Sequence, residues 1–231
     1  PSVHREYDEE IAILAGDTLY SKAFEIMLRT DAEPTASLDA IDCLARTCTR
    51  ICEGQSLDVD FETRPDVDTG EYLDMVERKT AVLYGAAASV PAIVVGADDE
   101  VVDALYRYGG NAGKAFQIQD DVLDLTVPSE QLGKQRGSDL VENKRTIITV
   151  HARDHGVAVD DLVDADDPEN VTDADIDAAV AELEDAGSID YARDLATDLT
   201  AQAKAELDVL PDNEARYLLR EIADYLIERG Y

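Results

Sequence analysis

Phe116-Gln-Ile-Gln-Asp-Asp-Val-Leu-Asp-Leu125 places three aspartates inside an otherwise apolar run. At about 100° per residue, a helix would gather four polar side chains on one face, because residues three and four apart are neighbours there. These four are Gln117, Asp120, Asp121 and Asp124. Apolar residues fill the rest of the circumference, which predicts a buried helix. Buried carboxylates are costly unless cations meet them, and hard cations such as Mg²⁺ share oxygen ligands with phosphates. The stretch therefore predicts a metal–diphosphate site.

The simpler alternative is that these aspartates are solvated surface acids. Surface aspartates seldom lie between apolar residues, as Asp120 and Asp121 do, so the pattern favours the metal site. The other adjacent aspartates have polar or turn-like surroundings typical of a surface, at Asp98-Asp99, Asp160-Asp161 and Asp166-Asp167.

Length and patterning indicate a single all-α domain. The chain has 231 residues, of which 45% are hydrophobic, and this is enough to bury a sizeable core. Apolar residues recur at helical spacing, strand-like alternation is absent, and the loops are short. We therefore expect a bundle of mostly antiparallel helices. No apolar run is long enough to span a membrane.

The formal charge of −32 comes from 52 acidic and 20 basic residues. Such a surface repels nucleic acid and anionic membranes, and it stores self-repulsion in the manner of halophilic proteins. We therefore expect a salt-loving source and no nucleic-acid partner. An anionic substrate would have to be attracted by local lysines and a metal ion.

Capping residues and helical spacing define the expected helices. We expect them over 11–28, from a cap at Ser37 to about Val59, over 70–90 closed by Pro91, from a cap at Asp98 to about Leu125, over 147–155, from a cap at Thr172 to about Asp185, after Gly187 to about Leu210, and from Pro211 to Gly230. An acidic loop is expected over 158–170.

The cysteines Cys43, Cys48 and Cys52 fall in one helical segment. A zinc site would need a fourth ligand at matching spacing, and no histidine is near. We interpret them as small apolar thiols of the core in a reducing cytoplasm.

Single polar residues within the expected helices leave two interpretations open. Lys79 lies among apolar residues, so it either extends to solvent or meets a buried anion. Asp17 is either an ordinary structural aspartate or a supporting residue of a site. Gly54 is unfavourable in a helix and predicts that something approaches the helix closely there, while Gln55 and Asp58 share a helical face.

The most basic segment of this acidic chain follows the aspartate stretch. It runs from Gly133 to Thr146, and its glycines predict a loop. Lysine binds phosphate as a mobile point charge, so this loop could supply the cationic side of a metal–diphosphate site. Its basic residues are Lys134, Arg136, Lys144 and Arg145.

With these blocks in order, the chain resembles the trans-isoprenyl diphosphate synthases, or polyprenyl synthetases. The matching blocks are Ala12-Ile-Leu-Ala-Gly-Asp17, Gly54-Gln-Ser-Leu-Asp58, Lys79-Thr80, and Phe116 to Asp124 followed by Gly133-Lys134 and Asn143-Lys-Arg-Thr146. The resemblance runs from the first residue to about Ala152. The last block is specific, and the others would be weak alone.

The resemblance implies a helical bundle around a central cavity, usually in a homodimer. It implies elongation of an allylic diphosphate by isopentenyl diphosphate, head to tail, with Mg²⁺. By position, Asp120, Asp121 and Asp124 would bind Mg²⁺. Lys79, Lys134 and Lys144 would contact the allylic diphosphate. Thr80 and Gln117 would steady the positive charge that forms as diphosphate departs, with Asp17, Gln55 and Asp58 as supporting residues.

One departure concerns the first aspartate-rich motif of the family, which would precede Pro1. We expect residues 1–231 to be a synthase domain that lacks its N-terminal helices and this motif, as an incomplete copy. The acidic composition suits a halophilic archaeal enzyme with a geranylgeranyl or farnesyl product.

Two rival functions fit part of the pattern. A terpene cyclase also ionises allylic diphosphates over aspartates, but the segment 133–146 argues against it. A non-catalytic regulatory subunit would suit the missing motif, but the intact second motif argues against it.

Overall fold

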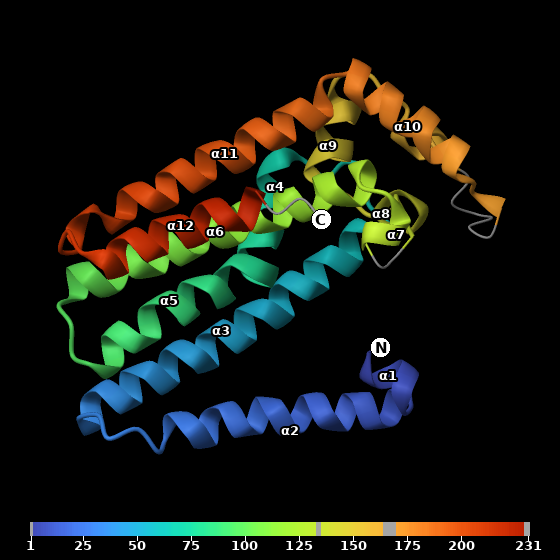
Figure 1. Ribbon diagram of the computed structural model, residues 1–231. Helices are drawn as coiled ribbons and strands as arrows, with labels where there is room; N and C mark the ends of the chain where they lie inside the picture. The colour runs from blue at the N-terminus through green and yellow to red at the C-terminus, as the bar shows by residue number, and fades with distance from the viewer. Residues whose placement is uncertain (1, 133–134, 164–169, 229–231) are drawn as a thin grey trace.

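The computed structural model describes residues 2–132, 135–163 and 170–228, and every regular element in these ranges is helical, as predicted (Figure 1). The elements are α1 (Val3–Glu6), α2 (Glu9–Met27), α3 (Pro34–Phe61), α4 (Thr69–Val76), the π-helical turn η1 (Glu77–Ala81), α5 (Val82–Val94), α6 (Asp99–Thr126), α7 (Ser129–Leu132), α8 (Ser138–Val141), α9 (Ile147–Asp154), the 3₁₀ turn η2 (Val159–Asp161), α10 (Asp173–Asp185), α11 (Ser188–Glu206), the 3₁₀ turn η4 (Leu207–Val209) and α12 (Glu214–Glu228).

Helix α6 is the centre of the bundle. It packs mainly against α5 on one side and α11 on the other, and successive long helices reverse direction (Figure 1). Its apolar face is fully buried at Ala115, Ile118 and Val122, among side chains from α4, α9, α10 and α11. Full burial of one aliphatic side chain contributes roughly 1.5–3 kcal/mol, so this face holds the aspartate stretch inside the protein.

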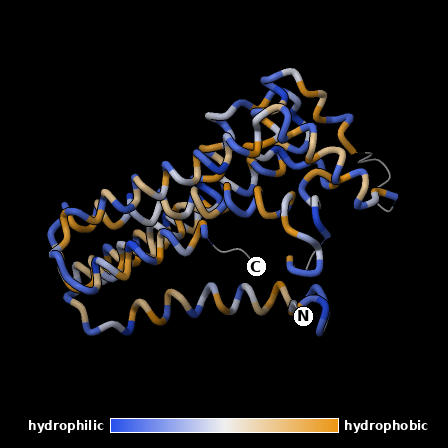
Figure 2. The backbone as a smooth tube through the Cα atoms, turned by 45° about the horizontal axis from the view of Figure 1, so that its top comes forward, coloured by the Kyte–Doolittle hydropathy of each residue, from blue (hydrophilic) through white to orange (hydrophobic). Residues whose placement is uncertain are grey.

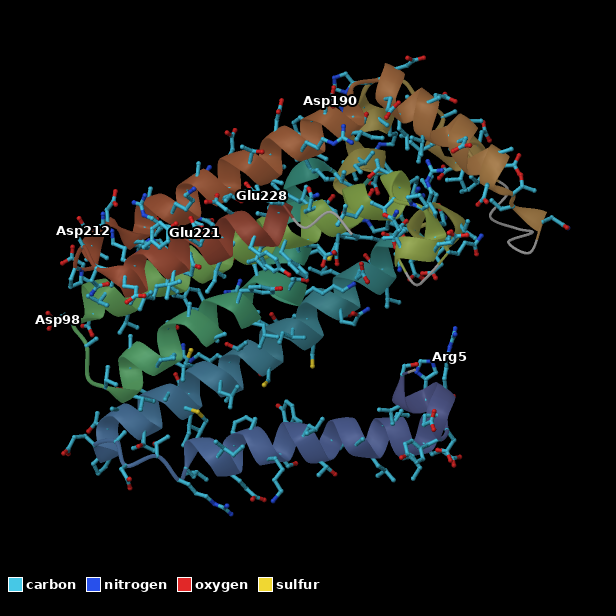
Figure 3. The ribbon with its side chains drawn as sticks, in the orientation of Figure 1. Arg5, Asp98, Asp190, Asp212, Glu221 and Glu228 are labelled. Carbon is cyan, nitrogen blue, oxygen red and sulfur yellow. The ribbon has the colours of Figure 1, made fainter. Side chains whose placement is uncertain are left out.

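Helix α2 lies at the edge of the bundle beside α3 and carries no buried residue. Apolar residues nevertheless recur along it, as along the other long helices (Figure 2). The acidic side chains labelled in Figure 3 are all exposed, in keeping with the charge of −32: Asp98, Asp190, Asp212, Glu221 and Glu228. Among the described residues, no helix is both long and apolar enough to cross a membrane.

Most predicted helices are confirmed, but three boundaries were wrong. Helix α3 begins at Pro34 and not at a Ser37 cap. Proline is favoured in the first turn of a helix, because the N–H groups of that turn have no partner within the helix and proline has no N–H. Pro91 does not close α5, which continues to Val94, since the proline falls in its last turn. Helix α12 begins at Glu214 and not at Pro211, with the Asn213 side chain accepting from the Arg216 amide.

Other expectations have mixed outcomes. Thr172 caps α10 in a capping box, and Gly187, which separates α10 from α11 as expected, has a left-handed conformation with φ 71°. Asp98 occupies the N-cap of α6 without a side-chain cap bond. The core assignment was wrong for Cys52, which is exposed, whereas the two other cysteines are half-buried. Of the acidic loop, residues 164–169 lie outside the described part of the chain.

The helix expected over 70–90 is interrupted by the π-helical turn η1, which carries Lys79 and Thr80. Single π-helical turns are rare and frequently occur at functional sites. The turn lies directly against α3, where Gly54 allows the close approach that its position predicted. A Cβ on Gly54 would lie 2.2 Å from the backbone nitrogen of Lys79.

Candidate active site

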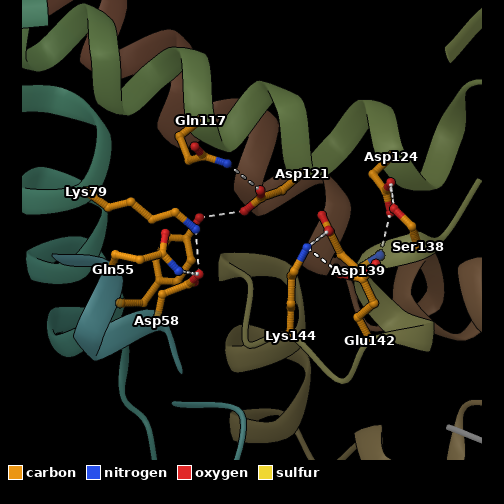
Figure 4. A network of polar contacts seen from close by, with 11 residues as sticks. Gln55, Asp58, Lys79, Gln117, Asp121, Asp124, Ser138, Asp139, Glu142 and Lys144 are labelled. Atoms are coloured by element: carbon orange, nitrogen blue, oxygen red, sulfur yellow. Dashed lines mark hydrogen bonds and ion pairs between the residues drawn. The ribbon is translucent and has the colours of Figure 1, made fainter. Parts of the chain in front are cut away.

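A polar cavity of about 70 Å³ opens between α3, α4, η1, α6 and the segment from α8 to α9. The polar side chains labelled in Figure 4 come from α3, η1, α6 and the segment from α8 to α9. The cavity is lined by Asp58, Tyr72, Met75, Val76, Lys79, Gln117, Asp121, Asp139, Lys144, Arg145 and Thr146.

A chain of hydrogen bonds crosses the cavity from η1 to α4 through α6. The Thr80 hydroxyl donates to Gln117 Oε1 at 3.0 Å, and Gln117 Nε2 donates to Asp121 Oδ1 at 3.1 Å. The Tyr72 hydroxyl donates to the other oxygen, Asp121 Oδ2, at 2.5 Å. These contacts fix the carboxylate from two sides, because each oxygen has its own donor.

Asp121 is a carboxylate in an unfavourable place for negative charge. It is 4% exposed, and burial raises its pKa to about 7, with smaller contributions from Asp139 and Asp120. The hydrogen bonds from Tyr72 and Gln117 oppose this shift only in part. A cation bound beside Asp121 would favour its ionised form.

Each lysine of the cavity is held by carboxylates. Lys79 Nζ lies 2.5 Å from Asp58 Oδ2, which also accepts from Gln55 Nε2 at 3.3 Å. Lys144 Nζ lies 3.1 Å from Asp139 Oδ1 and 2.7 Å from Glu142 Oε2. In Figure 4, Lys79 extends toward Asp121 from the left, and Lys144 lies below Asp121, where it contacts Asp139 and Glu142.

Asp124 lies one turn beyond Asp121 and points to a different neighbour. Its carboxylate accepts from the Ser138 hydroxyl at 2.8 Å and from the Asp139 amide at 3.1 Å. Asp124 is therefore tied to the first turn of α8, and it positions Asp139 at the edge of the cavity (Figure 4).

The structure brings together most of the predicted site residues. Asp58, Lys79, Gln117, Asp121 and Lys144 line the cavity, while Thr80 and Gln55 bond to residues that line it.

Three other predicted residues lie outside the cavity lining. Asp120 is half-buried on α6 outside the cavity lining, Asp124 faces α8, and Asp17 is exposed on α2. Lys134 lies outside the described residues. Within the described ranges, no group of three or more His, Cys, Asp or Glu is arranged to hold a metal ion.

Sequence reasoning missed two residues of the cavity, Tyr72 and Asp139. Asp139 could have been found, because it is an acid inside the most basic segment and five residues before Lys144. Tyr72 gave no signal, since a tyrosine in an amphipathic helix is ordinary core material.

The comparison with known proteins agrees with this geometry. A family model described as polyprenyl synthetase matches residues 1–183, which include every residue of the cavity. The chain belongs to the polyprenyl synthetase family. The predicted resemblance is thereby confirmed.

Two relatives match it along its whole length. Geranylfarnesyl diphosphate synthase of Natronomonas pharaonis is 68% identical over 231 residues, which are 100% of this chain and 67% of the relative. Geranylgeranyl diphosphate synthase of Methanosarcina mazei is 51% identical over 231 residues, which are 100% of this chain and 70% of the relative. The chain is therefore a homologue of polyprenyl diphosphate synthases and spans about two thirds of their length.

Solved structures share the fold. Geranylgeranyl pyrophosphate synthetase from Geoglobus acetivorans superimposes with a TM-score of 0.88 at 41% identity, covering 98% of this chain and 70% of that one. Polyprenyl synthase from Caulobacter crescentus, complexed with calcium and isoprenyl diphosphate, gives 0.86 at 33% identity, covering 98% and 68%. A divalent cation and a diphosphate thus accompany this fold in a relative.

Proposed function

We propose that this protein condenses an allylic diphosphate with isopentenyl diphosphate, head to tail, to give a linear polyprenyl diphosphate. The observation that carries the proposal is the cavity itself, which Lys79 and Lys144 line together with the buried carboxylate of Asp121. Two cations beside an acid suit a ligand that is itself an anion bound with a metal ion. The names of the relatives supply the substrate class.

In this proposal the lysines bind the allylic diphosphate. Lys79 and Lys144 reach it from the cavity walls. The resemblance adds Lys134 to this set. Arg145 lines the same cavity, so three cationic side chains can approach one diphosphate, counting those of the described residues alone. Charge-assisted contacts of this kind are about twice as strong as neutral hydrogen bonds.

Magnesium fits the chemistry of the donors, because Asp120, Asp121 and Asp124 offer hard carboxylate oxygens. A carboxylate has about four lone-pair sites, so the oxygens of Asp121 and Asp124 can accept a further partner beside their present hydrogen bonds. The described residues assemble no three-ligand group by themselves. The ion would therefore be held jointly by these aspartates and the diphosphate oxygens, where it would stabilise the charge of the leaving group.

The remaining residues suit the chemistry of an allylic cation. Breaking the C–O bond leaves a carbocation, and the hydrogen-bonded oxygens of Thr80 and Gln117 would steady it. Met75 and Val76 give the cavity an apolar wall that excludes water, which would otherwise trap the cation. The alkene of isopentenyl diphosphate attacks, and a proton is lost to the departing diphosphate.

The product and the assembly are further parts of the proposal. The names of the relatives support a geranylgeranyl or geranylfarnesyl product. The protein acts as a homodimer, as the resemblance implies, in the reducing cytoplasm that its free cysteines predict.

The deciding experiment is a product assay on the full natural protein with radiolabelled isopentenyl diphosphate, an allylic diphosphate and Mg²⁺. A linear polyprenyl diphosphate is the expected product. A cyclic hydrocarbon would indicate a terpene cyclase, and no product from folded protein would indicate a non-catalytic subunit.

A binding experiment tests the metal assignment separately. Mg²⁺ and pyrophosphate should each tighten the binding of the other in calorimetric titration, because they share one site. Asp120→Asn should weaken this mutual effect, while Asp17→Asn, an exposed change of the same kind on α2, should leave it intact. Independent binding of the two ligands would refute the shared site.

A further inference from the structure

The segment after α8 brings an acid and a base together by its backbone conformation. Asn143 has a left-handed conformation, with φ 54°, which asparagine tolerates better than most residues. The Lys144 amide turns back to donate to the Asp139 carbonyl at 2.8 Å. As a result, the side chains of Glu142 and Lys144 meet although they are only two residues apart.

Glu142 is the nearer of the two carboxylates that hold Lys144. Its Oε2 atom lies 2.7 Å from Lys144 Nζ, against 3.1 Å for Asp139 Oδ1. The side chain of Asp139 is 16% exposed and lines the cavity, whereas that of Glu142 is 58% exposed and does not. Glu142 thus neutralises a cavity lysine from outside the cavity.

The charges of the cavity make this contact consequential. Its described lining contains three acids and three bases, Asp58, Asp121 and Asp139 against Lys79, Lys144 and Arg145. Glu142 adds one more negative charge directly on Lys144. A diphosphate that approaches Lys144 must therefore displace a carboxylate or share the lysine with it.

We propose that Glu142 competes with the substrate diphosphate for Lys144, so that binding exchanges a carboxylate oxygen for a diphosphate oxygen on the lysine. This inference rests on the proposed function, in which Lys144 contacts the diphosphate. Burial alone would lower the pKa of Lys144, but Glu142 and Asp139 raise it, in keeping with a lysine that is already fully engaged by anions.

The competition predicts a gain of affinity from a substitution. Glu142→Gln should bind pyrophosphate with Mg²⁺ about two- to fivefold more tightly than the wild type, the range of an exposed ion pair. Glu221→Gln makes the same charge change on an exposed residue of α12 and should bind like the wild type. Both variants alter the surface only, so folding should be preserved, and melting curves would confirm this.

Two further measurements separate competition from a general charge effect. In a Lys144→Gln background, Glu142→Gln should no longer tighten binding, because the contested lysine is gone. The advantage of Glu142→Gln should also shrink as KCl rises, since salt screens an exposed ion pair.

The outcomes distinguish failure of this inference from failure of the proposed function on which it rests. If the wild type does not bind pyrophosphate with Mg²⁺, the proposed function fails and the competition fails with it. If the wild type binds and Glu142→Gln binds no more tightly than Glu221→Gln, the competition is refuted while the function stands. Weaker binding by Glu142→Gln would refute it too, and would mean that Glu142 positions Lys144 for substrate.

Discussion

Gly54 is the position where one added methyl group should disturb the whole site. Its Cα faces the backbone of η1, and a Cβ there would lie 2.2 Å from the Lys79 nitrogen and 2.6 Å from the Lys79 Cα. Both are backbone atoms, so no change of side-chain rotamer relieves the contact. Gly54→Ala must therefore separate α3 from η1.

The required displacement follows from these distances. Ordinary contact begins at 3.4 Å, so the nitrogen at 2.2 Å must retreat by about 1.2 Å, the difference between the two. Thr80 moves with the turn, and its 3.0 Å bond to Gln117 would be stretched or lost. Overpacking of this kind typically costs about 1–3 kcal/mol of stability, and a misplacement of about 1 Å can lower turnover on the order of 100-fold.

The assay combines urea unfolding with steady-state turnover of the full natural protein. Gly16→Ala is the matched control, because it makes the same change on exposed α2 with no neighbouring atom within 4 Å. It should stabilise the protein by about 0.5–1 kcal/mol without loss of turnover, since alanine favours helices. If Gly54→Ala proves as stable and as active as Gly16→Ala, the close contact between α3 and η1 does not position the site.

Three further predictions address stability. Tyr72→Phe should lower the free energy of unfolding by about 1.5–3 kcal/mol, because a buried hydrogen bond to Asp121 is lost; an unchanged urea midpoint would contradict this. Burial, and then His155, lower the pKa of His151, so the unfolded chain binds more protons and stability should fall as the pH drops below about 6.5. In His151→Gln the free energy of unfolding should fall less steeply over this pH range. Parallel pH profiles for the variant and the wild type would contradict the assignment to His151. Raising KCl from about 0.1 M to 1 M should raise the melting temperature by screening the charge of −32; a constant value would refute the halophilic interpretation.

The sequence alone determined the architecture and the place of the site. Helical spacing located the long helices, because apolar periodicity is a local property of the chain. The aspartates within an apolar run identified α6 as a buried helix, and the glycine at position 54 predicted a close approach to α3. The order of the motifs was enough to indicate the family, which the match over residues 1–183 then established.

Only the tertiary structure determined which neighbour each polar side chain of the site contacts. The sequence placed Asp121 and Asp124 on one helical face, but a face about 100° wide meets two neighbours, so Asp121 enters the cavity and Asp124 binds α8. One of the two donors to Asp121 is Tyr72, 49 residues away, and no local pattern couples these residues. Lys79 likewise lies in a π-helical turn, η1, whose backbone packs directly against α3 at Gly54. Contacts between helices distant in sequence are fixed by packing, which periodicity does not encode.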